Sequence, residues 1–171
     1  NELEMSSTDS YRSFPFFIFF FCNDTAPTAI YTLSLHDALP ISFDMNVVAY
    51  DPFVNEATAL DGAVAMFNDV DAMLPQADVL TFHVPLNDRT HRLLDARRLG
   101  LCRDGVLVLN VSRGGVLDEA ALVDALDHGK VQGAALDVFE HEPLAPEAAL
   151  RRHSRVLLTP HLGASTVEAQ Q

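Results

Sequence analysis

The chain has 171 residues, 49% of them hydrophobic and 20% charged, so it can bury the core of one domain and is not disordered as a whole. A net charge of −13 would repel a phosphate backbone, which excludes a typical nucleic-acid binder. The two cysteines are too few for a disulfide scaffold and have no metal-ligand spacing. We therefore expect neither a nucleic-acid partner nor a metal site.

The first marked feature along the chain is an apolar stretch from Phe14 to Cys22. It is too short to span a bilayer, which takes about 20 residues. The acidic residues before it have the wrong sign for a signal peptide, so we expect no membrane partner. The stretch lacks the alternation of a half-buried strand. Two interpretations remain: a buried or aggregation-prone strand, or a segment that is not biological.

Residues 23–42 favour the second interpretation, because they resemble the translation of a short-read sequencing adapter and primer. The run of phenylalanines before them would then be translated poly-T. Composition marks the same boundary, since all eight glycines lie at or after Gly62. We expect residues 1–42 to be a non-native segment and residues 43–171 to be the natural part of the chain.

Beyond residue 43 the pattern alternates between strands and helices. Val47–Tyr50 predicts a strand that ends in a turn. The apolar spacing of residues 56–67, behind a possible Asn55 cap, predicts a helix. A short helix over residues 69–74 and a strand over residues 79–82 follow.

The second half continues the alternation. Asp95 can cap a helical turn through Leu99, and Asp118 can cap an amphipathic helix that ends at Gly129. The three further predicted strands cover residues 106–109, 131–136 and 156–158. Apolar strands that alternate with helices predict an α/β fold with a doubly wound parallel sheet.

In such a sheet, ligands bind beyond the carboxyl ends of the strands. Polar and ionisable side chains follow each predicted strand, as expected for a binding edge. In chain order these residues are Asp51, His83-Val84-Pro85, Asn110-Val111-Ser112-Arg113-Gly114-Gly115, Asp137 and Thr159-Pro160-His161.

Three ordered motifs connect this edge to a known family: residues 110–119, residues 136–139 with Glu142-Pro143, and residues 160–166. With these motifs, residues 43–171 resemble the NAD-binding domain of D-isomer-specific 2-hydroxyacid dehydrogenases. The ending Gly163-Ala164-Ser165-Thr166 resembles the branch that acts on 3-phosphoglycerate. The resemblance implies a Rossmann-like fold, NAD as cofactor and a small 2-hydroxy or 2-keto acid as substrate.

The resemblance also implies a catalytic set of Arg113, Glu142 and His161. The planar guanidinium of Arg113 suits a substrate carboxylate. His161 can exchange a proton near neutral pH, and Glu142 would orient its ring. Glu140 is an alternative acid two positions earlier, and the choice of Glu142 rests on the family spacing alone.

The cofactor residues follow by the same resemblance. In the family's fold, a carboxylate at the end of the second strand binds the ribose hydroxyls and repels a 2′-phosphate. Asp51, which follows the predicted strand Val47–Tyr50, matches this position and favours NAD over NADP. Gly163 would let the backbone approach the carboxamide. The full set of expected cofactor-binding residues is Asp51, His83, Val84, Pro85, Val111, Ser112, Arg113, Asp137, His161 and Gly163.

The sequence departs from the family at the glycine loop, Gly-x-Gly-x-x-Gly, expected roughly 20 residues before the ribose acid. Residues 28–33 contain no glycine. We therefore expect an incomplete Rossmann-like sheet that lacks its native first strand and glycine loop. Either the Phe-rich stretch or residues 30–35 could occupy the central gap, and the sequence does not decide between them. We expect this chain to fold poorly and to lack activity.

For the intact parent protein, the resemblance favours NAD-dependent oxidation of 3-phosphoglycerate to 3-phosphohydroxypyruvate in serine biosynthesis, in the cytoplasm and as a homo-oligomer. One alternative is a glyoxylate or hydroxypyruvate reductase or another D-2-hydroxyacid dehydrogenase. Another is a non-catalytic NAD-sensing module similar to the related corepressors, against which the intact Arg113, Glu142 and His161 weigh. We expect the substrate-binding portions of the parent protein to lie outside this sequence.

Overall fold

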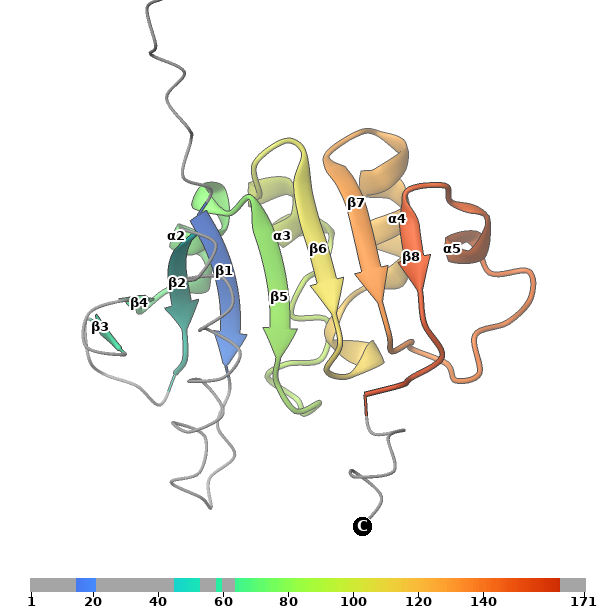
Figure 1. Ribbon diagram of the computed structural model, residues 1–171, viewed down its shortest axis with the longest axis horizontal. Coiled ribbons are helices and arrows are strands. Elements are labelled where there is room, and N and C mark those ends of the chain that lie inside the picture. Colours follow the sequence, from blue (N-terminus) through green and yellow to red (C-terminus); the bar gives the residue numbers. More distant parts are fainter. Residues whose placement is uncertain (1–14, 21–44, 53–57, 60–63, 164–171) are drawn as a thin grey trace, which may run out of the picture.

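One sheet runs through the protein, as a computed structural model of the chain shows (Figure 1). The structure describes residues 15–20, 45–52, 58–59 and 64–163. The strands within these ranges are β1 (Pro15–Phe20), β2 (Asn46–Tyr50), β3 (Thr58–Ala59), β4 (Val64–Phe67), β5 (Val79–His83), β6 (Val106–Asn110), β7 (Val131–Leu136) and β8 (Val156–Leu158).

The strand order is β3-β4-β2-β1-β5-β6-β7-β8. Every neighbouring pair is parallel except β3 with β4, a short antiparallel pair at the edge. From β4 to β7 the order is that of a doubly wound nucleotide-binding sheet, in which the first strand lies at the centre. The predicted α/β fold class and parallel sheet are therefore confirmed.

The Phe-rich stretch occupies the central position of this sheet. Phe17 pairs with Val48 of β2 on one side and with Leu80 of β5 on the other. The gap that the sequence left open is thus filled by β1 and not by residues 30–35, which lie outside the described residues. Strands of parallel sheets with both faces covered are continuous apolar runs without alternation, which is the sequence pattern of residues 15–20.

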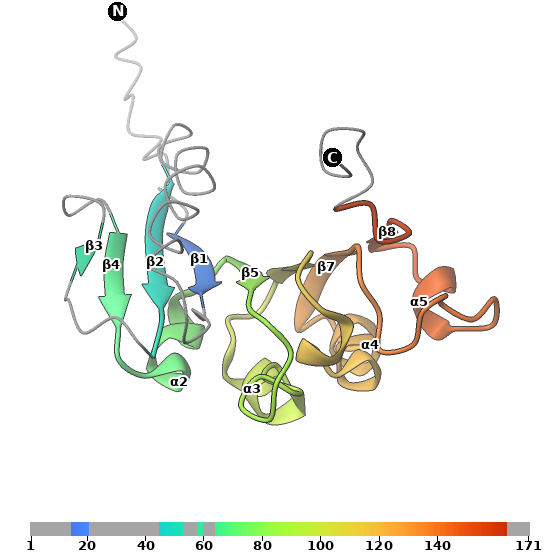
Figure 2. The ribbon, with the colours of Figure 1, turned by 90° about the horizontal axis from the view of Figure 1, so that it is seen from below.

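Four helices accompany the strands within the described ranges: α2 (Val70–Met73), α3 (Ala96–Leu101), α4 (Glu119–Asp127) and α5 (Ala149–Arg152). Two 3₁₀ turns, η2 (Leu74–Gln76) and η3 (Gly114–Val116), complete them. Figure 2 shows α2, α3 and α4 together on one side of the sheet. None of the described helices is long and apolar enough to cross a membrane.

Aspartate caps begin the first three of these helices, and those at Asp95 and Asp118 confirm the caps that the sequence predicts. Asp69, Asp95 and Asp118 each accept a backbone hydrogen bond, from Asp71, Arg98 and Ala121, at 2.8–3.0 Å. The predicted end of α4 is also confirmed, since Gly129 has a φ of 77°, a left-handed conformation that favours glycine.

The predicted helix over residues 56–67 is wrong, because the described part of this range forms β3 and β4. Val64 pairs with Val47 of β2 and is fully buried. Pairing with an existing strand therefore outweighs the helical spacing of the apolar residues, which for short segments does not separate helix from strand. Asn55, the proposed cap, lies outside the described residues.

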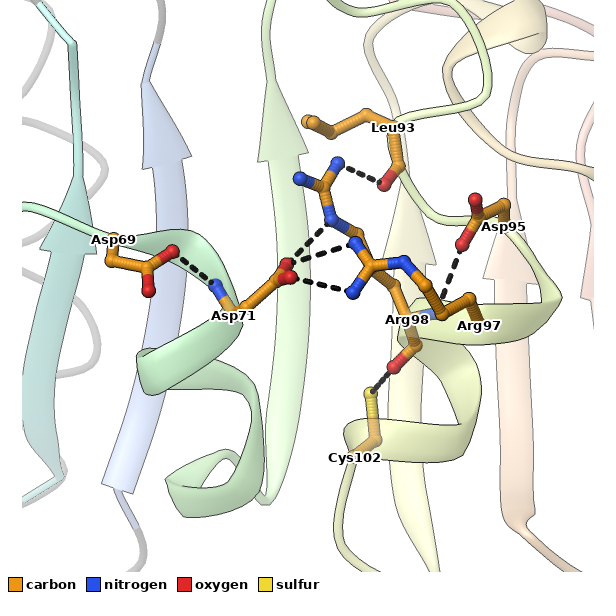
Figure 3. Close-up of polar contacts among 7 residues, drawn as sticks. All are labelled: Asp69, Asp71, Leu93, Asp95, Arg97, Arg98 and Cys102. Carbon is orange, nitrogen blue, oxygen red and sulfur yellow. Dashed lines mark hydrogen bonds and ion pairs between the residues drawn. The ribbon is translucent and has the colours of Figure 1, made fainter.

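Helices α2 and α3 are joined by a cluster of charged side chains (Figure 3). Asp71 accepts hydrogen bonds from Arg97 Nη1 at 2.6 Å and from Arg98 Nε at 2.8 Å. Arg98 also donates to the carbonyl oxygen of Leu93 at 2.9 Å. These contacts fix α2 to α3 on one side of the sheet (Figure 2). They are not part of the carboxyl edge, where ligands are expected to bind.

The core lies between the sheet and these helices. Leu122 and Leu126 of α4 are fully buried, as are Leu80 of β5 and Val108 of β6. Burial of such aliphatic side chains is the main favourable contribution to folding. The strands β5 to β8 are fixed side by side, so the loops after them meet at one edge (Figure 1).

Candidate active site at the carboxyl edge of the sheet

The loop after β6 is shaped by the buried side chain of Asn110. Its Nδ2 donates to the carbonyl oxygen of Arg113 at 3.0 Å, and its Oδ1 accepts from Ser112 N and Ser112 Oγ at 3.1 and 2.9 Å. Ser112 is therefore turned inward, whereas Val111 is half exposed. Arg113 Nη1 donates back to the carbonyl oxygen of Ser112 at 2.7 Å. Asn110 thus fixes the turn that carries Arg113.

Gly114 brings this loop against the loop after β7. A Cβ atom on Gly114 would lie 1.8 Å from the carbonyl oxygen of Phe139 and 2.7 Å from the backbone nitrogen of Glu140. No side chain fits there, because the obstacles are backbone atoms that cannot rotate away. The glycine therefore allows the Arg113 loop and the Phe139 loop to pack directly.

Asp137, at the end of β7, holds the segment after β8. Its carboxylate accepts from Thr159 Oγ1 at 2.5 Å, from Leu162 N at 2.8 Å and from Gly163 N at 3.0 Å. Burial raises the pKa of Asp137, but these hydrogen bonds outweigh burial and leave the pKa below its ordinary value. The backbone nitrogen of His161 also donates to the Asp137 carbonyl oxygen at 2.8 Å. His161 is thereby placed beside the end of β7.

His161 and Glu142 form a hydrogen-bonded pair. The imidazole Nδ1 donates to Glu142 Oε2 at 2.8 Å, and the other carboxylate oxygen accepts from Phe139 N at 3.1 Å. The hydrogen bond from His161, followed by that from Phe139, holds the pKa of Glu142 below its ordinary value. His161 has a φ of 53°, an uncommon conformation for a residue other than glycine and one that often marks a functional site.

Arg113, Glu142 and His161 line one cavity of about 440 Å³. Gly114 and Phe139 contribute to its walls. A second cavity, of about 590 Å³, shares Glu142 and His161 but not Arg113. The three residues predicted to be catalytic therefore come together in the first cavity, from loops after three neighbouring strands. Chemically, a guanidinium, a carboxylate and an imidazole there can bind an anion and exchange a proton.

The remaining residues expected to bind the cofactor lie at the ends of β2 and β5. Asp51 follows β2 and is buried. His83 ends β5, and its Nε2 lies 3.1 Å from Thr81 Oγ1. The side chain of Val84 is buried in the core, so a ligand could contact only its backbone, whereas Pro85 is half buried. None of these four residues lines the cavity of His161.

These side chains fit one part of a dinucleotide better than another. A carboxylate at the end of β2 suits ribose hydroxyls, and the Arg113 and His161 loops suit the reacting end. The pyrophosphate needs glycines after the first strand, so that backbone amides can approach it. Residues 21–44, which follow β1, contain no glycine. The residues present therefore fit the ribose and nicotinamide sides of NAD but not its pyrophosphate.

One contact at this edge is absent from the sequence-based predictions. The side chains of Glu119, at the start of α4, and Glu140, in the loop after β7, each accept a hydrogen bond from the backbone nitrogen of the other. No local pattern joins two glutamates so far apart in the sequence. The described residues contain no group of three or more His, Cys, Asp or Glu side chains that could hold a metal ion.

The strand order and the polar carboxyl edge define a doubly wound nucleotide-binding domain. More specifically, the chain belongs to the family described as "D-isomer specific 2-hydroxyacid dehydrogenase, NAD binding domain", whose model matches residues 37–163. The resemblance inferred from the motifs is thereby confirmed, and NAD is the cofactor of this family.

Relatives of known name support the same family. The chain is 46% identical over 129 residues to D-3-phosphoglycerate dehydrogenase of Archaeoglobus fulgidus, a match that covers 75% of this chain and 24% of that protein. It is 45% identical over 126 residues to the enzyme of the same name from Synechocystis sp., covering 74% and 22%. The chain thus spans about a quarter of the length of the curated relatives it matches.

Solved structures agree on the fold. An NADPH-dependent glyoxylate/hydroxypyruvate reductase from Sinorhizobium meliloti, in complex with NADP and malonate, has a TM-score of 0.78 at 28% identity and covers 94% of this chain and 46% of that chain. A glyoxylate reductase from Paecilomyes thermophila has a TM-score of 0.74 at 30% identity and covers 92% and 45%.

Proposed function

We propose that the chain carries the catalytic residues of an NAD-dependent D-2-hydroxyacid dehydrogenase, whose intact parent protein oxidises 3-phosphoglycerate to 3-phosphohydroxypyruvate. The observation that carries the proposal is the convergence of Arg113, Glu142 and His161 in one cavity, with His161 hydrogen-bonded to Glu142 at 2.8 Å. The first relatives named above, both D-3-phosphoglycerate dehydrogenases, support the choice of substrate.

Each of the three side chains has a distinct role in this proposal. The guanidinium of Arg113 binds the carboxylate of the hydroxy acid. Glu142 accepts the Nδ1 hydrogen bond and fixes the ring of His161, so Nε2 is the atom that takes the hydroxyl proton. NAD, where it binds, supplies the hydride acceptor. In the reverse direction, His161 returns the proton to the carbonyl oxygen.

The cofactor residues are proposed on the same basis. Asp51 would bind the ribose hydroxyls and disfavour a 2′-phosphate, which selects NAD over NADP. Val84 would contribute through its backbone, since its side chain is buried. The complete proposed set is Asp51, His83, Val84, Pro85, Val111, Ser112, Arg113, Asp137, His161 and Gly163.

We also propose that residues 1–42 are non-native and that the chain, as it stands, does not turn over substrate. The reason to expect no turnover is the absence of glycine from residues 21–44, which follow the central strand. NADH titration of the purified chain, followed by assay with phosphohydroxypyruvate, tests this. Micromolar NADH binding with turnover would show the proposal of inactivity to be wrong.

The catalytic roles are tested in the parent protein that contains residues 43–171. We expect His161→Gln to reduce kcat by a factor of about 100 to 10,000, the usual contribution of a general acid or base. Arg113→Gln should mainly raise KM. His141→Gln is the matched control, because His141 lines the same cavity but has no proposed role. Equal losses in His141→Gln and His161→Gln would contradict the assignment.

A second candidate is a glyoxylate or hydroxypyruvate reductase, which the names of two solved neighbours favour. Comparison of kcat/KM for phosphohydroxypyruvate, hydroxypyruvate and glyoxylate in the parent protein separates the two functions. A non-catalytic NAD-sensing module is disfavoured by the assembled Arg113, Glu142 and His161. We further propose that the parent protein is a cytoplasmic homo-oligomer. Size-exclusion chromatography with light scattering can test its oligomeric state.

A further inference from the structure

The start of α4 and the loop after β7 are joined by a reciprocal contact, which we name the Glu119–Glu140 clasp. The backbone nitrogen of Glu140 donates to Glu119 Oε1 at 2.6 Å, and the backbone nitrogen of Glu119 donates to Glu140 Oε1 at 3.3 Å. Each carboxylate therefore receives a backbone hydrogen bond from the other segment, although the two side chains carry the same charge.

The clasp lies next to the backbone that orients the catalytic pair. Glu140 follows Phe139, whose backbone nitrogen donates to Glu142 Oε1 at 3.1 Å. The opposite oxygen of Glu142 accepts from His161 at 2.8 Å. Glu119 is thus connected to the imidazole through one short stretch of backbone and one carboxylate.

The surroundings of the clasp favour Glu119 as the residue that fixes this stretch. Gly114 lies so close to this backbone that an added Cβ would meet the Phe139 carbonyl oxygen at 1.8 Å, which leaves the backbone little room to move. Arg92, the cation nearest to Glu140 by ion-pair distance, lies 3.9 Å from its Oε1 and is half exposed. An exposed ion pair of that length orients a loop weakly, whereas a hydrogen bond of 2.6 Å to a carboxylate is strong.

We propose that Glu119 is a positioning residue for the Glu142–His161 pair, acting through the backbone of Phe139 and Glu140. The geometric part of this inference stands on the contacts above, and its kinetic consequence rests on the proposed dehydrogenase function. Loss of the Glu119 carboxylate would free the Glu140 amide, loosen the Phe139 amide and release Glu142 from its present rotamer. His161 would then lose its fixed orientation while Arg113 kept its own contacts.

Amide hydrogen exchange and carboxyl titration by NMR on the full chain test the geometry without any assay of activity. In Glu119→Ala we expect the Glu140 and Phe139 amides to exchange about tenfold faster, since each loses or weakens one hydrogen bond. The side-chain carboxyl of Glu142 should titrate closer to its ordinary pKa. Glu119→Gln keeps an acceptor oxygen at the same reach and should restore both measurements.

Two further variants separate positioning from general loss of stability. Asp71→Asn breaks the contacts between α2 and α3, which do not involve Glu119, Glu140 or Glu142. It should lower global stability without changing the Glu142 titration. Glu119→Asp keeps the charge but shortens the side chain, so it should resemble Glu119→Ala at the Phe139 amide. If Glu119→Ala does not fold, the comparison of Glu119→Asp with Glu119→Gln decides.

The kinetic arm uses the parent protein. We expect Glu119→Ala to lower kcat about tenfold with KM for the hydroxy acid nearly unchanged, and Glu119→Gln to recover most of kcat. If the parent protein has no dehydrogenase activity, the proposed function fails, while the NMR measurements still decide the role of Glu119. The inference is overturned if neither Glu119→Asp nor Glu119→Gln changes Phe139 amide exchange and the Glu142 titration. It is also overturned if the two variants change these measurements to the same extent.

Discussion

Asp71 and Glu142 both have pKa values below their ordinary range, and their partners differ in kind. Asp71 accepts hydrogen bonds from the guanidinium groups of Arg97 and Arg98, which lower its pKa to about 2 (Figure 3). Glu142 accepts hydrogen bonds from the His161 imidazole and from a backbone amide, which also lower its pKa. One cluster joins two helices, and the other lies where the loops after the strands meet.

The difference in partners sets what each cluster can do. An arginine keeps its proton at every pH that a protein experiences, so the Asp71 contacts do not change near neutral pH and have a structural role. The imidazole side chain is suited to proton exchange, which is the role proposed above for His161 in the Glu142–His161 pair. A lowered carboxyl pKa alone therefore does not mark an active site, and the partner must be named as well.

The largest expected effect is that of Gly114→Ala, which disrupts the site and leaves the helix cluster intact. The new Cβ would lie 1.8 Å from the Phe139 carbonyl oxygen, so the Arg113 loop and the Phe139 loop must separate. We expect a loss of about 3 kcal/mol in the free energy of unfolding, at the upper end for overpacked positions. Urea denaturation followed by circular dichroism measures it.

Gly100→Ala is the matched control in α3, beside the helix cluster. No atom lies within 4 Å of the position that its Cβ would take. Alanine in a helix is more favourable than glycine, so we expect a gain of roughly 0.5–1 kcal/mol. Similar losses in the two glycine variants would show that the close packing of the two loops is not special.

The next largest effect is expected for Asp137→Ala. It removes both carboxylate oxygens that accept from Thr159, Leu162 and Gly163, so one hydroxyl and two backbone amides lose their partner. We expect a loss of about 2 kcal/mol at pH 7. Because the folded pKa of Asp137 is lowered, its contribution is present above the unfolded value of about 3.9 and is lost as pH falls through the folded value. The variant should lack that part of the acid-induced loss, which urea denaturation at several pH values would reveal.

Local rules predict most of the regular structure after residue 68. The caps at Asp95 and Asp118 and the stop at Gly129 are properties of a few adjacent residues, and the structure confirms each of them. The range 56–67 fails for the opposite reason, because pairing of β4 with β2 is a contact between distant segments. The place of β1 is likewise decided by the partners available on both sides.

The candidate site follows the same division. The sequence motifs name Arg113, Glu142 and His161, and the structure brings them into one cavity. Their support comes from long-range contacts that no local pattern contains. Glu119 at the start of α4 interacts with Glu140 in the loop after β7, and Asp137 binds the segment that carries His161. Such contacts depend on the sheet order, which is known only once the strands are paired.

Asp71→Asn sharpens the comparison from the side of the helix cluster. The contacts are partly exposed, so we expect a loss of only about 0.5–1 kcal/mol at pH 7. The folded pKa of about 2 lies below the unfolded value, so the wild-type chain loses this contribution as pH falls from about 4 toward about 2. The variant should lack this loss, and the Glu142 titration should not change. A shifted Glu142 titration would show that the two clusters are coupled.

The smallest effect is expected for Arg92→Ala, which removes the cation beside the Glu119–Glu140 clasp. Arg92 lies 3.5 Å from Asp118 and 3.9 Å from Glu140, and its side chain is 51% exposed. Such pairs are screened by water and salt, so we expect a change below about 0.5 kcal/mol that disappears in 1 M salt. Urea denaturation at low and high salt measures it. We expect this loss to be smaller than that of Asp71→Asn, because Asp71 has the shorter contacts with its arginines. A larger loss would show that charge pairing, and not the crossed backbone hydrogen bonds, holds the start of α4 to the loop after β7.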